Sequence, residues 1–317
     1  MQPADPGGAA SLPALIGRHL DQRAHGDDAD VARLTAAIED RHPGRVAAVL
    51  LYGSYLRGKR DTLLDFYVLL DRLAPPALPS RLQALGNRVL PPNVYYLSLP
   101  ADGDRPALRA KYATMTLDQF EQGMHRFQSY FWSRFTQPAG LVRARDEDAR
   151  GRVIAALADA VRAFIGRVAA TLPERFDAAL PWRAGFDRTY RCELRAEQAA
   201  AGAGLYDQQA PFFDAVLAAY AREPGAALRV DGDGYRRAVP LRDGAMTWRL
   251  RAFQGKGLSV LRLVKAAGTF DDPLDYLLWK IERHSGIYIA PTQRQRRHPL
   301  IFAWPLLWRL YRRGAFR

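Results

Sequence analysis

The stretch from Leu50 to Asp71, LLYGSYLRGKRDTLLDFYVLLD, carries residue types that can bind a phosphate chain and a metal ion. Gly53 and Ser54 follow one apolar run, and Asp65 lies within the next. A glycine at a tight turn allows backbone N–H groups and the serine hydroxyl to approach a phosphate closely. A carboxylate on the neighbouring strand is the kind of ligand that Mg²⁺ prefers. These residue types therefore suit a site for a phosphate chain and a metal ion, and the alternative is a strand–turn–strand unit in which Asp65 is an edge-strand residue.

Four short segments predict the strands that would position these residues. Their apolar runs are bounded by Gly, Pro, Asn or Asp, which is typical of strands. An amphipathic helical pattern follows the fourth segment. We therefore expect an α/β (α+β) fold that begins with a small mixed sheet and its helices. The predicted strands cover residues 45–54, 61–71, 91–100 and 106–117, and the predicted helix covers residues 117–135.

A strongly periodic helix is predicted from Asp146 to Leu172. Acidic residues occupy its first turn, where the helix dipole favours them, and Pro173 ends it. Its apolar residues recur at helical spacing, so one face is expected to be buried. That face consists of Val153, Leu157, Val161, Phe164, Ile165, Val168 and Leu172.

The rest of the chain predicts a second, mostly helical part. Residues 174–230 are Ala-rich and look helical, and residues 230–253 suggest a hairpin or a loop. Further helices are expected at residues 255–268 and 272–286, the second with Asp272 as its cap. The expected units are a nucleotidyltransferase-like domain over residues 1–142, a mostly helical domain over 143–250, and a C-terminal helical segment with a basic aromatic tail over 251–317.

The Gly-Ser step and the strand carboxylate resemble the polymerase-β-like nucleotidyltransferase superfamily. Many members have a second carboxylate two residues after the first, where this chain has Tyr67. The chain more closely resembles the mitochondrial-type phosphatidate cytidylyltransferases, the family of mitochondrial translocator assembly and maintenance. Those proteins have a Tyr-Gly-Ser step and then Asp-Phe-apolar-apolar without the second carboxylate, a form that YGSY and LDFYV follow.

The same resemblance extends over about residues 48–198 and returns weakly near the C-terminus. Each short match alone is unspecific, so the resemblance rests on the shared order of the matches along the chain. Several glycines of the family are absent from this sequence. The matching segments are PPNVYYLS with Asn93, AKYATM with Lys111 and Tyr112, SYFWSRFTQP with Arg134 and Pro138, ATLPERFDAAL, TYRCELRAE with Glu193 and Arg195, and QGKGLSV with Lys256 and Gly257.

The resemblance implies a Mg²⁺-dependent cytidylyltransferase that makes CDP-diacylglycerol and pyrophosphate from CTP and phosphatidate. Asp65 and Glu193 would be the catalytic, metal-binding carboxylates. The alternative for Glu193 is a surface residue paired with Arg195 or Arg191, and the alternative for Lys256 is a solvated lysine in the first turn of a helix. Gly53, Ser54, Lys111, Tyr112, Arg134, Arg195, Lys256 and Gly257 would bind the nucleotide or its phosphates.

The net charge of +13 and a pI near 10.1 favour an anionic partner. The electrostatic potential of so basic a protein attracts nucleic acid, anionic lipid or phosphorylated substrates. The alternative is an Arg-rich surface that is only solvated. Residues 293–317 combine seven Arg with aromatic residues and no acid. This composition suits a segment in the lipid headgroup layer, and the alternative is a helix docked on the core by its Trp residues. No nucleic-acid-binding module is recognised, so no nucleic-acid partner is expected.

The single cysteine, Cys192, excludes an intrachain disulfide, and the first twenty residues lack the basic leader of a signal peptide. We therefore expect a cytoplasmic protein bound peripherally to the inner face of the membrane. Two other functions remain open on the sequence. One is a nucleotidyltransferase that acts on another phosphorylated or hydroxylated acceptor or on a protein, and the other is a catalytically dead relative that binds membrane or RNA.

Overall fold

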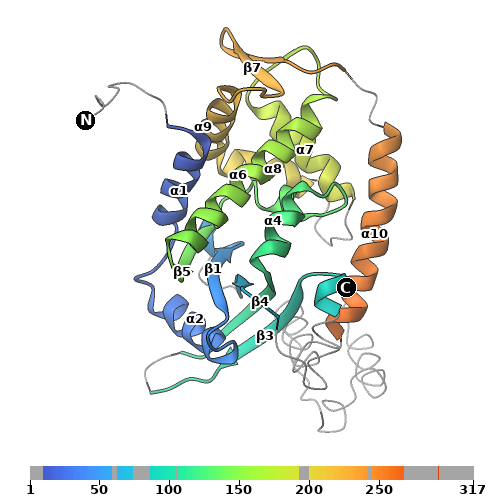
Figure 1. Ribbon diagram of the computed structural model, residues 1–317. Coiled ribbons are helices and arrows are strands. Elements are labelled where there is room, and N and C mark those ends of the chain that lie inside the picture. The colour runs from blue at the N-terminus through green and yellow to red at the C-terminus, as the bar shows by residue number, and fades with distance from the viewer. Residues whose placement is uncertain are drawn as a thin grey trace, which may run out of the picture.

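A computed structural model of the chain describes residues 10–58, 63–73, 86–103, 106–192, 200–241, 245–267 and 292. In these residues, helices pack on both faces of a mixed sheet, which confirms the predicted fold class (Figure 1). The strands are β1 (Val46–Tyr52), β2 (Leu64–Leu70), β3 (Asn93–Leu99), β4 (Leu108–Thr116), β5 (Gly140–Ala144), β6 (Arg175–Phe176), β7 (Leu228–Asp231) and β8 (Gly234–Arg237). The helices are α1 (Leu12–Gln22), α2 (Ala29–Arg41), the 3₁₀ turn η1 (Tyr55–Arg57), α4 (Leu117–His125), α5 (Phe131–Arg134), α6 (Glu147–Ala169), α7 (Ala179–Arg191), α8 (Ala200–Gln208), α9 (Ala210–Ala221) and α10 (Ala245–Ala267).

The main sheet has five strands in the order β3-β4-β2-β1-β5. All four predicted strands are present in it. β2 and β4 run parallel, and every other neighbouring pair is antiparallel. The fifth strand, β5, was not predicted and extends past residue 142, so the sheet continues beyond the end of the first predicted unit.

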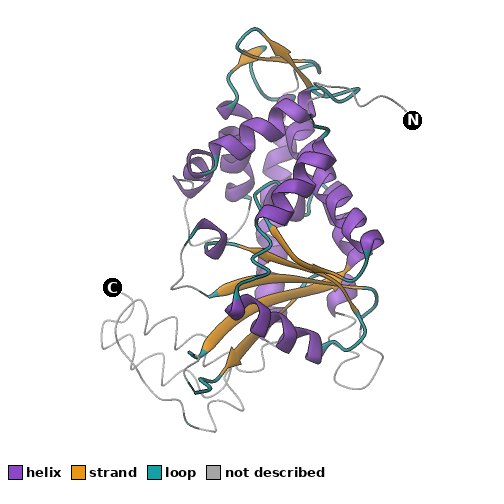
Figure 2. Ribbon diagram, turned by 90° about the vertical axis from the view of Figure 1, so that its left-hand side faces the viewer, coloured by secondary structure: helices purple, strands orange, loops and turns teal. Residues whose placement is uncertain are grey.

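The two faces of this sheet belong to different core clusters. One face, here called the α2 face, buries Phe66 and Tyr112 against α2. The opposite face, here called the α6 face, buries Tyr67 and Met115 against α1, α4, α5 and α6. Figure 2 shows the larger group of helices on one side of the sheet. Residues alternate between the faces along each strand, as strand geometry requires.

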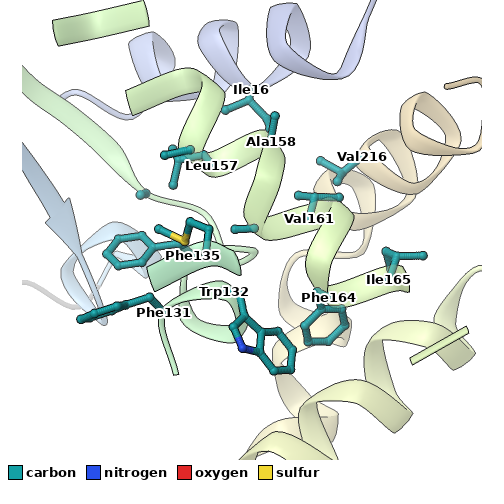
Figure 3. Packing of buried hydrophobic residues seen from close by; sticks show 14 of the residues in the cluster. Ile16, Phe131, Trp132, Phe135, Leu157, Ala158, Val161, Phe164, Ile165 and Val216 are labelled. Carbon is teal, nitrogen blue, oxygen red and sulfur yellow. The ribbon is translucent and has the colours of Figure 1, made fainter. Parts of the chain in front are cut away.

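Helix α6 forms the middle of the larger cluster, and the prediction of this helix is confirmed. Asp146 caps it, because its side chain accepts a hydrogen bond of 2.8 Å from the Ala149 N–H. All seven apolar residues predicted for its buried face are buried. Figure 3 shows Leu157 and Phe164 of α6 packed among residues that include Trp132.

Two predicted elements differ from the structure. The helix predicted over residues 117–135 is broken after His125, and only α5 resumes it. The hairpin predicted within residues 230–253 is present as β7 and β8, but α10 begins at Ala245, well before the expected start at Gly255. The predicted helix over residues 272–286 and the basic tail lie outside the described residues.

In the described part of the chain, no helix combines the length and the apolar character that crossing a membrane requires.

Candidate functional site

The Gly-Ser corner and the strand carboxylate meet at one end of the sheet. Gly53 directly follows β1 and has a φ of +96°, a conformation that favours glycine. A Cβ atom at this position would lie 2.8 Å from Oδ2 of Asp65, so any larger residue would displace the carboxylate. Gly53, Ser54 and Asp65 are all half-buried. Asp65 is the second residue of β2, so it is both near a strand end and directed at the corner.

Strand register places Lys111 beside Asp65 on the α6 face. Asp65 is paired with Tyr52 on β1 and with Lys111 on the parallel strand β4. Lys111 is in turn paired with Tyr96 on β3. A carboxylate and an ammonium group therefore lie in one row across the sheet. Tyr112, the next residue, points to the α2 face, where it is 2% exposed and packs in the other core cluster, so the structure does not bring it to Asp65.

Arg134 joins the site from α5. Its Nη1 donates a hydrogen bond of 2.9 Å to the Tyr67 hydroxyl. Its guanidinium carbon lies 5.5 Å from the ring centroid of Tyr52 and 4.9 Å from that of Tyr130. Tyr52 and Tyr67 are the neighbours of Asp65 across and along the sheet, so Arg134 brings a second cation to the same end of the α6 face.

Tyr67 occupies the position at which a second strand carboxylate was considered. It is 4% exposed, and burial raises the pKa of its phenol well above the usual value, while the Arg134 guanidinium acts in the opposite direction. The phenol therefore stays protonated at neutral pH and is a poor ligand for a hard cation. Its role is to fix Arg134 by accepting a hydrogen bond.

A small hollow adjoins the back of the corner. Its volume is about 20 Å³, room for about one water molecule. The Tyr52 hydroxyl donates a hydrogen bond of 3.1 Å to Oε1 of the buried Gln137, one of its lining residues. The hollow is too small for a ligand of several atoms, whereas Gly53, Ser54 and Asp65 are partly exposed outside it. The hollow is lined by Arg23, Tyr52, Gly53, Leu56, Gln137, Pro138, Leu205, Gln209 and Phe213.

Lys256 and Gly257 do not form the helix start that the sequence predicted. Both lie in the interior of α10 and are exposed. The backbone N–H groups at that point belong to the helix, so no anion site of the helix-terminus kind exists there. The neighbouring Gly255 has a packing role instead, because a Cβ atom there would lie 2.2 Å from the carbonyl oxygen of Cys192.

Asp65 is the carboxylate that the described structure offers to a metal ion at this corner. Glu193 and Arg195 lie outside the described residues. Within the described ranges, no group of three or more His, Cys, Asp or Glu gathers in a metal-binding arrangement. One partly exposed carboxylate fits Mg²⁺ in the manner of sites that use one or two carboxylates, substrate phosphates and water. These residues do not form a metal site made only of protein ligands.

Sequence reasoning missed three side chains that complete this end of the sheet. Tyr52 and Gln137 are linked by a hydrogen bond, and Tyr130 stacks on Arg134. The sequence signal was the aromatic run around Arg134, which lies within the helix predicted over residues 117–135. The break after α4 turns that run towards the sheet instead.

No protein-family model matches this chain, and no curated protein sequence matches it. The resemblance to the phosphatidate cytidylyltransferases therefore stays a prediction drawn from the residues themselves.

Proposed function

We propose that this protein is a Mg²⁺-dependent nucleotidyltransferase that makes CDP-diacylglycerol and pyrophosphate from CTP and phosphatidate at a membrane surface. The observation that carries the proposal is the approach of the Asp65 carboxylate to Gly53, which only a glycine permits. Lys111 and Arg134 add two cations at the same end of the sheet. The choice of CTP and phosphatidate comes from the resemblance.

In the proposed reaction, a phosphate oxygen of phosphatidate forms a bond to the α-phosphorus of CTP. The bond from that phosphorus to the bridging oxygen breaks, and pyrophosphate leaves with the electron pair. A phosphate monoester is already a nucleophile near neutral pH, so no strong general base is required. This chemistry is compatible with a site that has few carboxylates.

Each residue of the site has a role that its position suits. Asp65 would hold Mg²⁺, which when bound neutralises charge on the phosphate chain. The backbone at Gly53 and the Ser54 hydroxyl would contact phosphate oxygens. Lys111 and Arg134 would orient the anionic substrates and stabilise charge on the transferring group, and Tyr67 and Tyr130 would keep Arg134 in place.

A peripheral membrane location is supported by charge and by α10. The net charge of +13 draws the protein to anionic lipid. Met246, Leu250 and Phe253 are 74%, 56% and 80% exposed, and their spacing places them on one side of α10. Exposed apolar residues on a helix of a basic protein suit the headgroup layer. We place the protein on the inner face of the membrane as part of the proposal.

The test is pyrophosphate release from CTP, Mg²⁺ and vesicles that contain phosphatidic acid. Asp65→Ala is expected to lower turnover by at least about 100-fold, as loss of a group that stabilises the transition state does. Because Asp65 is only half-buried, the free energy of unfolding should change by far less than the activation free energy of turnover does. Asp40→Ala, at an exposed position of α2, is the matched control and should change neither quantity.

The same assay separates the other functions. Pyrophosphate release with CTP that does not depend on the lipid would indicate a different acceptor. A folded protein that binds no nucleotide would indicate a dead relative, and the proposal would then be wrong. A large loss of stability in Asp65→Ala would mean that this carboxylate is structural.

A further inference from the structure

Tyr130 has a second arginine on its ring, and this arginine comes from the other end of the chain. The guanidinium carbon of Arg262 lies 4.7 Å from the Tyr130 centroid, and that of Arg134 lies 4.9 Å from it. Arg134 belongs to α5, and Arg262 belongs to α10. Two cations therefore converge on one aromatic ring at the edge of the candidate site.

Arg262 has donor capacity that the protein does not use. It is half-buried, and its Nε is buried without a hydrogen-bond partner. Among the residues that the structure describes, no carboxylate pairs with it. A guanidinium group with a sheltered, unused N–H group is costly unless an acceptor binds it. The stacking on Tyr130 satisfies the face of the guanidinium and leaves its edge for an anion.

The position of Arg262 is fixed by contacts earlier in α10. Arg251 is 2% exposed, and it donates hydrogen bonds of 2.7 Å to the Phe127 carbonyl and 3.1 Å to the Ser129 carbonyl. Arg262 lies about three helical turns further on, which returns it to the same side of the helix. Arg251 thereby holds α10 against the loop that carries Tyr130, and Arg262 is directed at the ring.

The location of the pair identifies the chemical class of its ligand. Arg134 contacts Tyr52 and Tyr67, the neighbours of Asp65, so an anion between Arg134 and Arg262 would lie next to the proposed phosphate chain. A phosphate monoester carries about two negative charges and accepts paired hydrogen bonds from guanidinium groups. A neutral hydroxyl acceptor would bring no counter-charge to Arg262.

We propose that Arg262 and Arg134 together bind the phosphate monoester of the acceptor, an inference that rests on the proposed nucleotidyl transfer. The monoester belongs either to a lipid or to a soluble ester. α10 carries both Arg262, which lies over Tyr130, and the exposed Met246, Leu250 and Phe253, so this one helix would link the proposed membrane face to the acceptor site.

The first experiment measures KM for each substrate in Arg262→Gln. The KM for phosphatidic acid vesicles is expected to rise about tenfold or more, with the KM for CTP changed less than about twofold, as loss of a charge-assisted hydrogen bond to one substrate predicts. Arg262→Lys should recover only part of the loss, because lysine cannot form the paired contact. Arg229→Gln removes the same charge from an exposed position of β7 and should change neither KM. Equal changes for both substrates, or no change in either, would overturn the inference.

A binding experiment without CTP separates this inference from the proposed function. The protein is sedimented with vesicles of phosphatidic acid in phosphatidylcholine, with vesicles of phosphatidylglycerol, which is a diester, and in competition with glycerol 3-phosphate. Arg262→Gln should lose binding to phosphatidic acid more than to phosphatidylglycerol, and Asp65→Ala should retain binding to both lipids.

Competition by glycerol 3-phosphate would identify a soluble ester as a sufficient ligand, and the absence of competition would identify the lipid. If Arg262→Gln selectively loses binding to phosphatidic acid but the wild type shows no turnover, the acceptor site is supported and the proposed nucleotidyl transfer is wrong. Equal loss on both lipids would overturn the acceptor site.

Discussion

The two faces of the five-stranded sheet use neighbouring residues of the same strands for different purposes. On the α2 face, Phe66 and Tyr112 are 1% and 2% exposed and lie in an apolar cluster. On the α6 face, Asp65 and Lys111 stand in the row just before the buried Tyr67. A strand that alternates between faces can thus carry core packing and a polar site within two consecutive residues. The burial of most β2 residues therefore gives no indication of the polar site, because that site is confined to one face and one end of the strand.

Replacing Phe66 should give the largest loss of stability and leave the site intact. Phe66→Ala removes a ring from a closely packed cluster, and we expect the free energy of unfolding to fall by about 3–5 kcal/mol. Denaturant unfolding measures this change. In the fraction that remains folded, the KM for CTP should stay at the wild-type value, in contrast to the neighbouring Asp65→Ala. A large rise in that KM would show that the two faces are coupled.

Gly53→Ala should combine a smaller loss of stability with a loss of nucleotide affinity. The left-handed backbone at this position costs an alanine about 1–2 kcal/mol. The added Cβ would also displace the Asp65 carboxylate, so CTP affinity should fall about tenfold, or about 1.4 kcal/mol. Calorimetric titration with CTP and Mg²⁺ measures the second effect.

Gly44→Ala is the control for this substitution. Gly44 also has a positive φ, of +63°, but nothing lies near its missing Cβ. It should lose similar stability and keep full CTP affinity. If Gly44→Ala and Gly53→Ala bind CTP equally well, the close approach at Gly53 has no role in binding.

The effect expected to be smallest at neutral pH is a change in acid sensitivity on the α2 face. His42 lies beside Tyr112, and burial, with the charges of Arg45 and Arg41, lowers its pKa to about 4. The unfolded chain therefore binds a proton on His42 near pH 6.5, and the folded chain does so only near pH 4. Stability from this group is complete above pH 6.5 and is lost as pH falls towards 4. His42→Gln should flatten the loss of stability in this range, as urea unfolding at several pH values would show, with nucleotide turnover unchanged at pH 7. An identical profile in the variant would contradict this prediction.

The sequence alone predicted the local parts of this structure well. Apolar runs bounded by turn residues located β1 to β4, and the helical period located α6 with its buried face. The start of α10 was missed because the glycines before it predicted a hairpin or loop that was extended through Phe253, whereas the hairpin ends at Arg237. β5 was missed because it is short and is defined by pairing with β1.

The candidate site was predictable only in part, for a related reason. Gly53 and Asp65 are close in sequence, and their spacing was sufficient to predict that they meet. Lys111 reaches Asp65 through the parallel pairing of β2 with β4, a long-range register that no local pattern specifies. Arg262 joins through α10, whose docking depends on the buried Arg251, a residue type that composition predicts to be exposed.

The insertion of β4 between β2 and β3 has a consequence for when Lys111 reaches the Gly-Ser corner during folding. The pairing of β1 with β2 closes a short loop, so we expect the glycine corner and its carboxylate to assemble early in folding. Lys111 arrives only after β4 has entered an interior position of the sheet, which requires a longer and slower loop closure. A chain stalled before that step would present an acidic corner that repels phosphate. The proposed nucleotide site would therefore be complete only when the sheet itself is complete.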